Sequence, residues 1–119
     1  MTSLPSEWQR CRYFGFWDVP RTFIWRYGGK TLLLTSEFRE DLDDYDPQYQ
    51  VYELDQVRAD ELDCLSDVQI ESGIGRRCSE IPVAEFRWHP ERERAQGRFF
   101  ARVCYMGPPR SFDEVPGKG

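Results

Sequence analysis

The residues of this chain that could take part in chemistry are concentrated in one acidic run. Within positions 37–46, Arg39 is the one basic residue among six carboxylates, which are Glu37, Glu40, Asp41, Asp43, Asp44 and Asp46. Closely spaced carboxylates can ligate a divalent cation, or they can attract a cationic protein surface. The rest of the sequence decides between these two uses.

A calcium-binding loop of the EF-hand type is excluded by the spacing of this run. Such a loop starting at Asp41 needs glycine at its sixth position and glutamate at its twelfth. The chain has Asp46 and Tyr52 at those positions. A looser carboxylate site for Mg²⁺ or Ca²⁺ does not depend on this spacing.

A metal-dependent phosphodiesterase or nuclease is the alternative that would use such a site, because a metal ion held by carboxylates can activate water near a cation. The residues that it would use are Asp41, Asp43 or Asp46 together with Glu85 and Arg87. The lysine expected beside such a centre is missing, since the chain contains only Lys30 and Lys118. The sequence therefore favours a protein without catalytic residues, metal or cofactor.

Nucleophilic chemistry has little to build on. His89 is the single histidine, and it stands before Pro90, where a turn residue is the simpler interpretation. The four cysteines, at positions 11, 64, 78 and 104, form no Cys-x-x-Cys pair of the kind found in zinc and redox sites. Residues 1–7 lack the charged and apolar regions of a signal peptide, so we expect a cytoplasmic protein with four reduced thiols and no membrane segment.

A second binding surface is suggested by arginines interleaved with aromatic residues near the N-terminus, because such a sheet can bind phosphates and stack bases. The arginines are Arg10, Arg12, Arg21 and Arg26, and the aromatic residues are Tyr13, Phe14, Phe16, Trp17 and Trp25. The sequence pI of about 4.9 disfavours nucleic-acid binding, since backbone affinity depends on the summed positive field. Packing in the core is the simpler role for these aromatic residues.

The charge is distributed very unevenly along the chain. Residues 37–67 carry twelve acidic and two basic side chains, whereas the segments before and after carry net charges of +3 and +2. Crowded carboxylates repel one another, which should raise their pKa values, and a cationic partner relieves that repulsion. We therefore expect a small protein-binding domain, such as an inhibitor or immunity-type protein for a basic partner. The residues predicted to bind are Glu37, Glu40, Asp41, Asp43, Asp44, Tyr45 and Asp46.

A β-hairpin over residues 21–36 is the element around which the fold should be organised. Gly28 and Gly29 can adopt the positive φ angles of a two-residue turn, and both arms are rich in β-branched, aromatic and aliphatic residues. The turn fixes the pairing, which places four large side chains on one core face: Phe23, Trp25, Leu32 and Leu34. The other face has Ile24 opposite Leu33 with polar neighbours, so we expect it to be partly covered.

The other expected elements follow from alternation and turn residues. Strands are predicted over residues 10–18, 49–54 and 80–88, with loops at 72–75 and at His89-Pro90. Residues 98–106 could form a strand or a helix, and their Val, Tyr and Phe content favours the strand. A helical turn is predicted to begin at Arg39 and to end at Pro47, and a short helix over Asp55–Ser66.

Together these elements predict a single small α+β domain. Its main part would be an antiparallel, curved meander of five to six strands with one or two short helices. The domain would span residues 10–106, between a loose lead-in at residues 1–9 and a disordered tail at residues 107–119.

Overall fold

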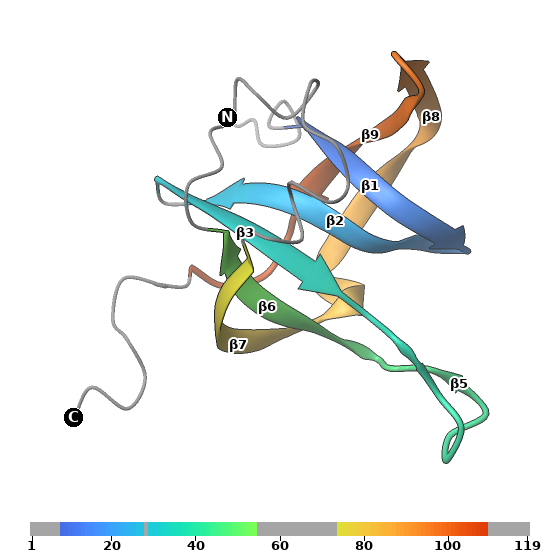
Figure 1. Cartoon of the computed structure of the whole chain (residues 1–119), viewed down its shortest axis with the longest axis vertical. Coiled ribbons are helices and arrows are strands. Elements are labelled where there is room, and N and C mark those ends of the chain that lie inside the picture. Colours follow the sequence, from blue (N-terminus) through green and yellow to red (C-terminus); the bar gives the residue numbers. More distant parts are fainter. Residues whose placement is uncertain (1–7, 28, 55–73, 110–119) are drawn as a thin grey trace.

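The described part of the computed structural model comprises residues 8–27, 29–54 and 74–109, and most of it is β-strand (Figure 1). The strands are β1 (Gln9–Trp17), β2 (Val19–Tyr27), β3 (Lys30–Thr35), β4 (Phe38–Arg39), β5 (Asp44–Tyr45), β6 (Gln48–Leu54), β7 (Ile74–Pro82), β8 (Phe86–Ala95) and β9 (Arg98–Tyr105). Seven of them form one antiparallel sheet in the order β7-β6-β3-β2-β1-β9-β8. Strands β4 and β5 form a separate two-stranded hairpin.

The predicted α+β class is wrong, because the described residues are nearly all β. The helical element among them is a single 3₁₀ turn, η3 (Val83–Glu85), and the main sheet has seven strands rather than five or six. The residues expected to start a helical turn at Arg39 form the β4–β5 hairpin instead. The predicted helix over Asp55–Ser66 lies outside the described residues, as do residues 1–7 and 110–119 of the predicted lead-in and tail.

The main sheet curls, because its two edge strands are consecutive in the chain. Strand β7 lies at one edge and β8 at the other, and the three residues of η3 join them. The amide N–H of Val83 donates to the carbonyl oxygen of Pro47 at 2.9 Å, and the amide of Met106 donates to the carbonyl of Glu85 at 2.7 Å. These bonds hold η3 against both sides of the curled sheet.

The central hairpin has the predicted register. Phe23 pairs with Leu34, Trp25 with Leu32 and Ile24 with Leu33. Gly29 has a φ angle of +82°, which suits the glycine-rich turn, whereas Gly28 lies outside the described residues. The predicted core face is confirmed, since its four large side chains are at most 2% exposed. Ile24 and Leu33 on the opposite face are buried as well, so the expectation that this face is covered is also confirmed.

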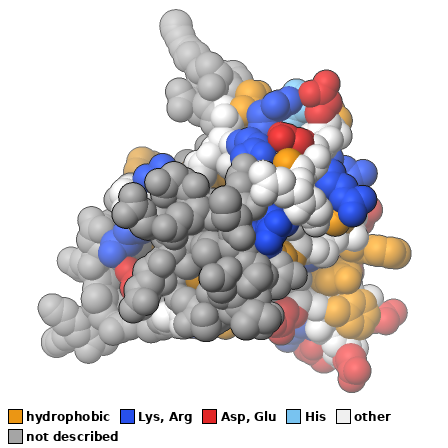
Figure 2. Space-filling view, turned by 45° about the horizontal axis from the view of Figure 1, so that its top comes forward, with side chains coloured by type: hydrophobic (Ala, Val, Ile, Leu, Met, Phe, Trp, Pro, Cys, Tyr) orange, Lys and Arg blue, Asp and Glu red, His pale blue; other side chains and the backbone are white. Residues whose placement is uncertain are grey.

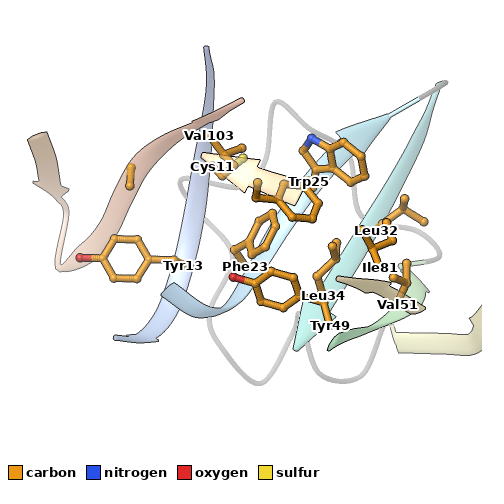
Figure 3. Close-up of a cluster of buried hydrophobic side chains, with 12 residues drawn as sticks. Cys11, Tyr13, Phe23, Trp25, Leu32, Leu34, Tyr49, Val51, Ile81 and Val103 are labelled. Carbon is orange, nitrogen blue, oxygen red and sulfur yellow. The ribbon is translucent and has the colours of Figure 1, made fainter. Parts of the chain in front are cut away.

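The interior of the curled sheet is an aromatic core to which all seven strands contribute (Figure 3). The Phe86 ring lies 5.1 Å from Trp25, 5.4 Å from Phe23 and 5.5 Å from Tyr49, each at nearly right angles. Such edge-to-face contacts add to the stabilisation that burial provides. The hydroxyl of Tyr49 donates to the carbonyl oxygen of Pro20 at 2.7 Å, so this buried polar group is satisfied.

The C-terminal half differs from the prediction in its element boundaries. The alternating pattern at residues 80–88 is divided between two strands, because Pro82 has no amide hydrogen to donate and η3 follows it. His89 and Pro90 do not end the strand; β8 continues to Ala95 through a register shift between Trp88 and Arg92. Strand β7 begins at Ile74, within residues 72–75 that were predicted to form a loop. The strand preferred for residues 98–106 is confirmed as β9.

Two of the cysteines are buried thiols in the sheet. Cys11 is 1% exposed, and Cys104 is 6% exposed, as predicted from its apolar surroundings. Burial raises the pKa of the Cys11 thiol far above its ordinary value, because a thiolate there would lose its hydration. Since the thiolate is the reactive form, the fold suppresses the chemistry of Cys11.

This burial predicts a difference in alkylation between the native and the unfolded protein. Cys11 should resist iodoacetamide at pH 8 in the folded protein and should react readily in denaturant. Peptide mapping by mass spectrometry measures both rates. Rapid labelling of Cys11 in the folded protein would contradict its placement in the core.

The core assignment predicts the effect of truncating Trp25. Trp25→Ala should lower the free energy of unfolding by about 3–5 kcal/mol, since a large buried aromatic side chain is lost. Trp17→Ala is the matched control, because Trp17 is 60% exposed and its loss should change stability by less than about 0.5 kcal/mol. Denaturant unfolding of both variants tests this, and equal stabilities would show that the core is misassigned.

Candidate functional site

The acidic run forms the β4–β5 hairpin, which projects from the body of the sheet between β3 and β6 (Figure 1). Phe38 pairs with Tyr45 and Arg39 with Asp44. At the tip, the amide of Leu42 donates to the carbonyl of Arg39 at 3.1 Å. The structure therefore brings all the predicted binding residues together on one hairpin.

The tip of the hairpin is closed by an ion pair. The guanidinium of Arg39 donates to both carboxylate oxygens of Asp41, at 3.2 Å and 2.7 Å, and one of its nitrogens lies 3.9 Å from the carboxylate of Asp46. The hydrogen bond from Arg39 and its charge hold the pKa of Asp41 below its ordinary value. The expected rise from carboxylate repulsion is therefore wrong for Asp41, because the single arginine in the run outweighs the neighbouring acids.

The base of the hairpin is tied to the main sheet by a chain of hydrogen bonds. The hydroxyl of Ser36 donates to the carbonyl of Asp46 at 2.6 Å and accepts from the guanidinium of Arg21 at 3.2 Å. The Asp46 carboxylate accepts the amide hydrogen of Gln48 at 2.9 Å. Asp46 is thus a structural residue that fixes the exit of the hairpin into β6.

Aromatic residues stiffen the same base. The Tyr45 ring lies between the guanidinium of Arg21, 4.4 Å from its centre, and the ring of Phe38, at 5.4 Å. Arg21 also donates to the carbonyl of Trp17 at 3.0 Å, which connects the hairpin to the β1–β2 turn. Tyr45 is half-buried, and its ring lies where the hairpin leaves the sheet.

What the hairpin presents to solvent is a mixture of apolar and acidic side chains. Phe38 is 51% exposed and Leu42 is 46% exposed. The side chains of Glu37, Glu40 and Asp43 are exposed and make no hydrogen bond to any group in the described part of the chain. We call Phe38 and Leu42 together with these three carboxylates the acidic tip.

Two of the residues that the alternative metal-dependent enzyme would use have other partners in the structure. Glu85 lies in η3, where its carboxylate accepts a hydrogen bond from the hydroxyl of Tyr105 at 3.1 Å. Asp41 is engaged by Arg39. Within residues 8–27, 29–54 and 74–109, acidic, histidine and cysteine side chains form no group of three or more that could hold a metal ion.

The arginine and aromatic residues predicted as a possible nucleic-acid surface do not form one continuous surface. Trp25 and Tyr13 belong to the core, and Arg12 is 2% exposed. Arg10 is engaged in a bidentate pair with Glu93, at 3.1 Å for each nitrogen. Phe16 and Trp17 remain exposed at the far end of β1.

The residues that join Phe16 and Trp17 at this end come from the other end of the chain. Arg92, Arg94 and Phe99 lie on β8 and β9, and the guanidinium of Arg92 lies 4.1 Å from the centre of the Phe16 ring. These three residues were not predicted from the sequence to belong to a binding surface, because they come near Phe16 only through the pairing of β1 with β9. The one local signal is the close spacing of Arg92 and Arg94.

No family model, no curated protein and no solved structure matches the chain. In the part of the chain that the structure describes, no helix has the length and apolar character needed to cross a bilayer.

The Arg39–Asp41 pair leads to a test by titration. Asp41 should titrate below its ordinary pKa of 3.8 in the folded protein, and Arg39→Gln should raise that pKa. Because folding favours the ionised form, the contribution of the pair to stability is present above about pH 4 and is lost as the pH falls through the folded pKa. Carboxyl-detected NMR titration measures the shift.

The control for this titration is Arg77→Gln. Arg77 pairs with Glu80 on β7, so its loss should leave the titration of Asp41 unchanged. An Asp41 pKa above 3.8 in the parent protein would show that repulsion among the carboxylates dominates after all.

Proposed function

We propose that this chain is a protein-binding domain that uses the acidic tip to hold a partner with a basic surface, in the manner of an inhibitor or immunity-type protein. The single observation that carries the proposal is the combination of exposed apolar side chains and uncompensated carboxylates on a projecting, internally tied hairpin. Phe38 and Leu42 supply the apolar part, and three exposed carboxylates lie on the same hairpin.

The composition of the acidic tip matches that of a protein interface. Interfaces have an apolar centre, in which phenylalanine is enriched, and a polar rim that remains accessible to solvent. Phe38 and Leu42 would bury apolar area against the partner, and the carboxylates would pair with its lysines or arginines. Burial of the two apolar side chains supports affinity, whereas the carboxylates mainly support the rate and specificity of association.

The rigidity of the hairpin supports the same proposal. A binding loop that is already held in its bound conformation loses less entropy on association. Here the Arg39–Asp41 pair closes the tip, and the Ser36–Asp46 hydrogen bond fixes the base. The ordered interactions therefore lie at the two ends of the hairpin. The side chains of Glu37, Glu40 and Asp43 remain exposed to solvent.

Variants that remove either half of the acidic tip test the proposal. The charge variant is Glu37→Gln with Glu40→Gln and Asp43→Asn, and the apolar variant is Phe38→Ser with Leu42→Ser. Neither should change the melting temperature by more than a few degrees, because all five side chains are exposed. Both should lose the basic proteins that the parent captures from a lysate of the source cells. A captured partner should bind the purified parent less tightly as salt rises, since exposed charges are screened over about 8 Å at physiological ionic strength.

The matched control removes three carboxylates elsewhere on the sheet, by replacing Glu80, Glu91 and Glu93 with glutamine. These residues pair with Arg77, Arg102 and Arg10, and exposed pairs contribute little to stability. The control has the same change in net charge as the charge variant and should keep the partner. Identical captured proteins for the parent, the charge variant and the apolar variant would refute the proposal.

A further inference from the structure

The inner face of β1, β9 and β8 extends beyond the aromatic core and becomes exposed. Register places Ala101 beside both Cys11 and Arg92, and Phe99 beside both Tyr13 and Arg94. Side chains alternate between the two faces of a strand, so Arg92 and Arg94 share the face of Ala101, which belongs to the core. The inner face is therefore buried in the core at one end of the sheet and exposed to solvent at the other.

The open end of this face is aromatic. Phe16 is 43% exposed and Phe99 is 45% exposed, and their ring centres lie 6.0 Å and 5.8 Å from that of Tyr13. Gly15, with a φ angle of +68°, precedes Phe16 and allows the backbone turn that brings this ring towards Tyr13. Phe16 and Phe99 thus stand on either side of a buried tyrosine that fixes their positions.

Arginine side chains lie over both exposed rings. The guanidinium carbon of Arg92 lies 4.1 Å from the centre of Phe16, and that of Arg94 lies 5.4 Å from the centre of Phe99. Neither arginine forms an ion pair with a carboxylate of the described residues. We call Phe16, Phe99, Arg92 and Arg94 the arginine–aromatic face.

The outer face of the same strands is built differently. Arg10 pairs with Glu93 there, and Arg102 pairs with Glu91 at 2.9 Å. Strands β1, β8 and β9 carry seven arginines and two glutamates, and both glutamates are used by outer-face arginines. Neither glutamate of these strands is therefore left to pair with Arg92 or Arg94, which lie beside the aromatic rings of the inner face.

We propose that the arginine–aromatic face binds single-stranded nucleic acid. Phosphates would pair with Arg92 and Arg94, and unpaired bases would stack on Phe16, Phe99 and the guanidinium planes. A hollow of ≈ 170 Å³ lies beside Phe16, with Trp88, His89 and Arg92 in its wall, and offers a place for a base that leaves the stack.

The acidic pI of the whole chain does not oppose this binding. Charges further apart than about 8 Å are largely screened at physiological ionic strength, so the field at a site is set by the charges near it. Figure 2 shows basic side chains together with some acidic ones at the upper right, and acidic side chains at the lower right.

The carboxylate of Asp18 allows a test of whether negative charge beside Arg92 weakens binding. Asp18 lies in the wall of the same hollow as Arg92 and would repel a phosphate there. Asp18→Asn should therefore strengthen binding. Asparagine also suits the positive φ angle of 70° at this position, so the substitution should not disturb the turn.

The experiment is a fluorescence anisotropy titration of the full chain with labelled twelve-nucleotide oligo-U and oligo-dT, repeated from about 20 to 200 mM salt. Arg92→Gln with Arg94→Gln should reduce the salt slope of log K by about 1.4, since each phosphate contact to a single strand contributes about 0.7. Phe99→Ala should weaken binding about tenfold through the loss of stacking. The ratio of the two affinities shows whether RNA or DNA is preferred.

The matched control is Arg102→Gln, which removes the same charge from the outer face of β9. It should keep most of the affinity and a nearly unchanged salt slope. Melting temperatures of all variants establish that they are folded. Equal losses for Arg102→Gln and for either inner-face arginine replaced alone would overturn the proposal, because they would indicate only diffuse attraction.

Three other results would also overturn it: no binding of either oligonucleotide at 20 mM salt, no effect of Phe99→Ala, or weaker binding by Asp18→Asn. Displacement of the oligonucleotide by inorganic polyphosphate at an equal concentration of phosphate would count against it as well, since polyphosphate has no bases to stack. The acidic tip variants should bind the oligonucleotides as tightly as the parent or more tightly, which separates this face from the acidic tip.

Discussion

The packing of Phe86 against the inner face of the central hairpin is the interaction on which the rest of the structure depends. Phe86 opens β8, at one edge of the sheet, yet its ring lies against Phe23, Trp25 and Tyr49, which come from β2 and β6. This contact requires the sheet to curl, because the two edges are joined by only three residues of η3. Curling encloses one core between seven short strands, and an antiparallel sheet of this size gains its stability from such burial.

The curl also determines which surfaces are left for binding. The core occupies the region where the sheet is closed, so the inner face of β1, β9 and β8 emerges from it with Phe99, Arg92 and Arg94 exposed. The connection from β3 to β6 cannot enter the core, because half of its side chains are carboxylates. It leaves the sheet as the β4–β5 hairpin. An acidic and a basic surface are thereby kept on different parts of a small molecule.

The two surfaces are prepared for binding in different ways. In the hairpin, Arg39 neutralises Asp41 and Ser36 anchors Asp46, which leaves a few carboxylates beside Phe38 and Leu42. On the sheet, arginine pairing on the outer face leaves the inner-face arginines to lie over aromatic rings.

What the sequence by itself determined was local. The Gly-Gly turn and its flanking alternation predicted the register of β2 with β3 and the core face of Trp25, because a short turn and a two-residue period leave one pairing. The α+β class was wrong, since the run from Arg39, predicted as a helical turn, pairs as the β4–β5 hairpin. The pairing of β1 with β9, which brings Arg92 to Phe16, was decided by tertiary structure. It joins residues more than seventy positions apart, and only burial of the shared core selects it.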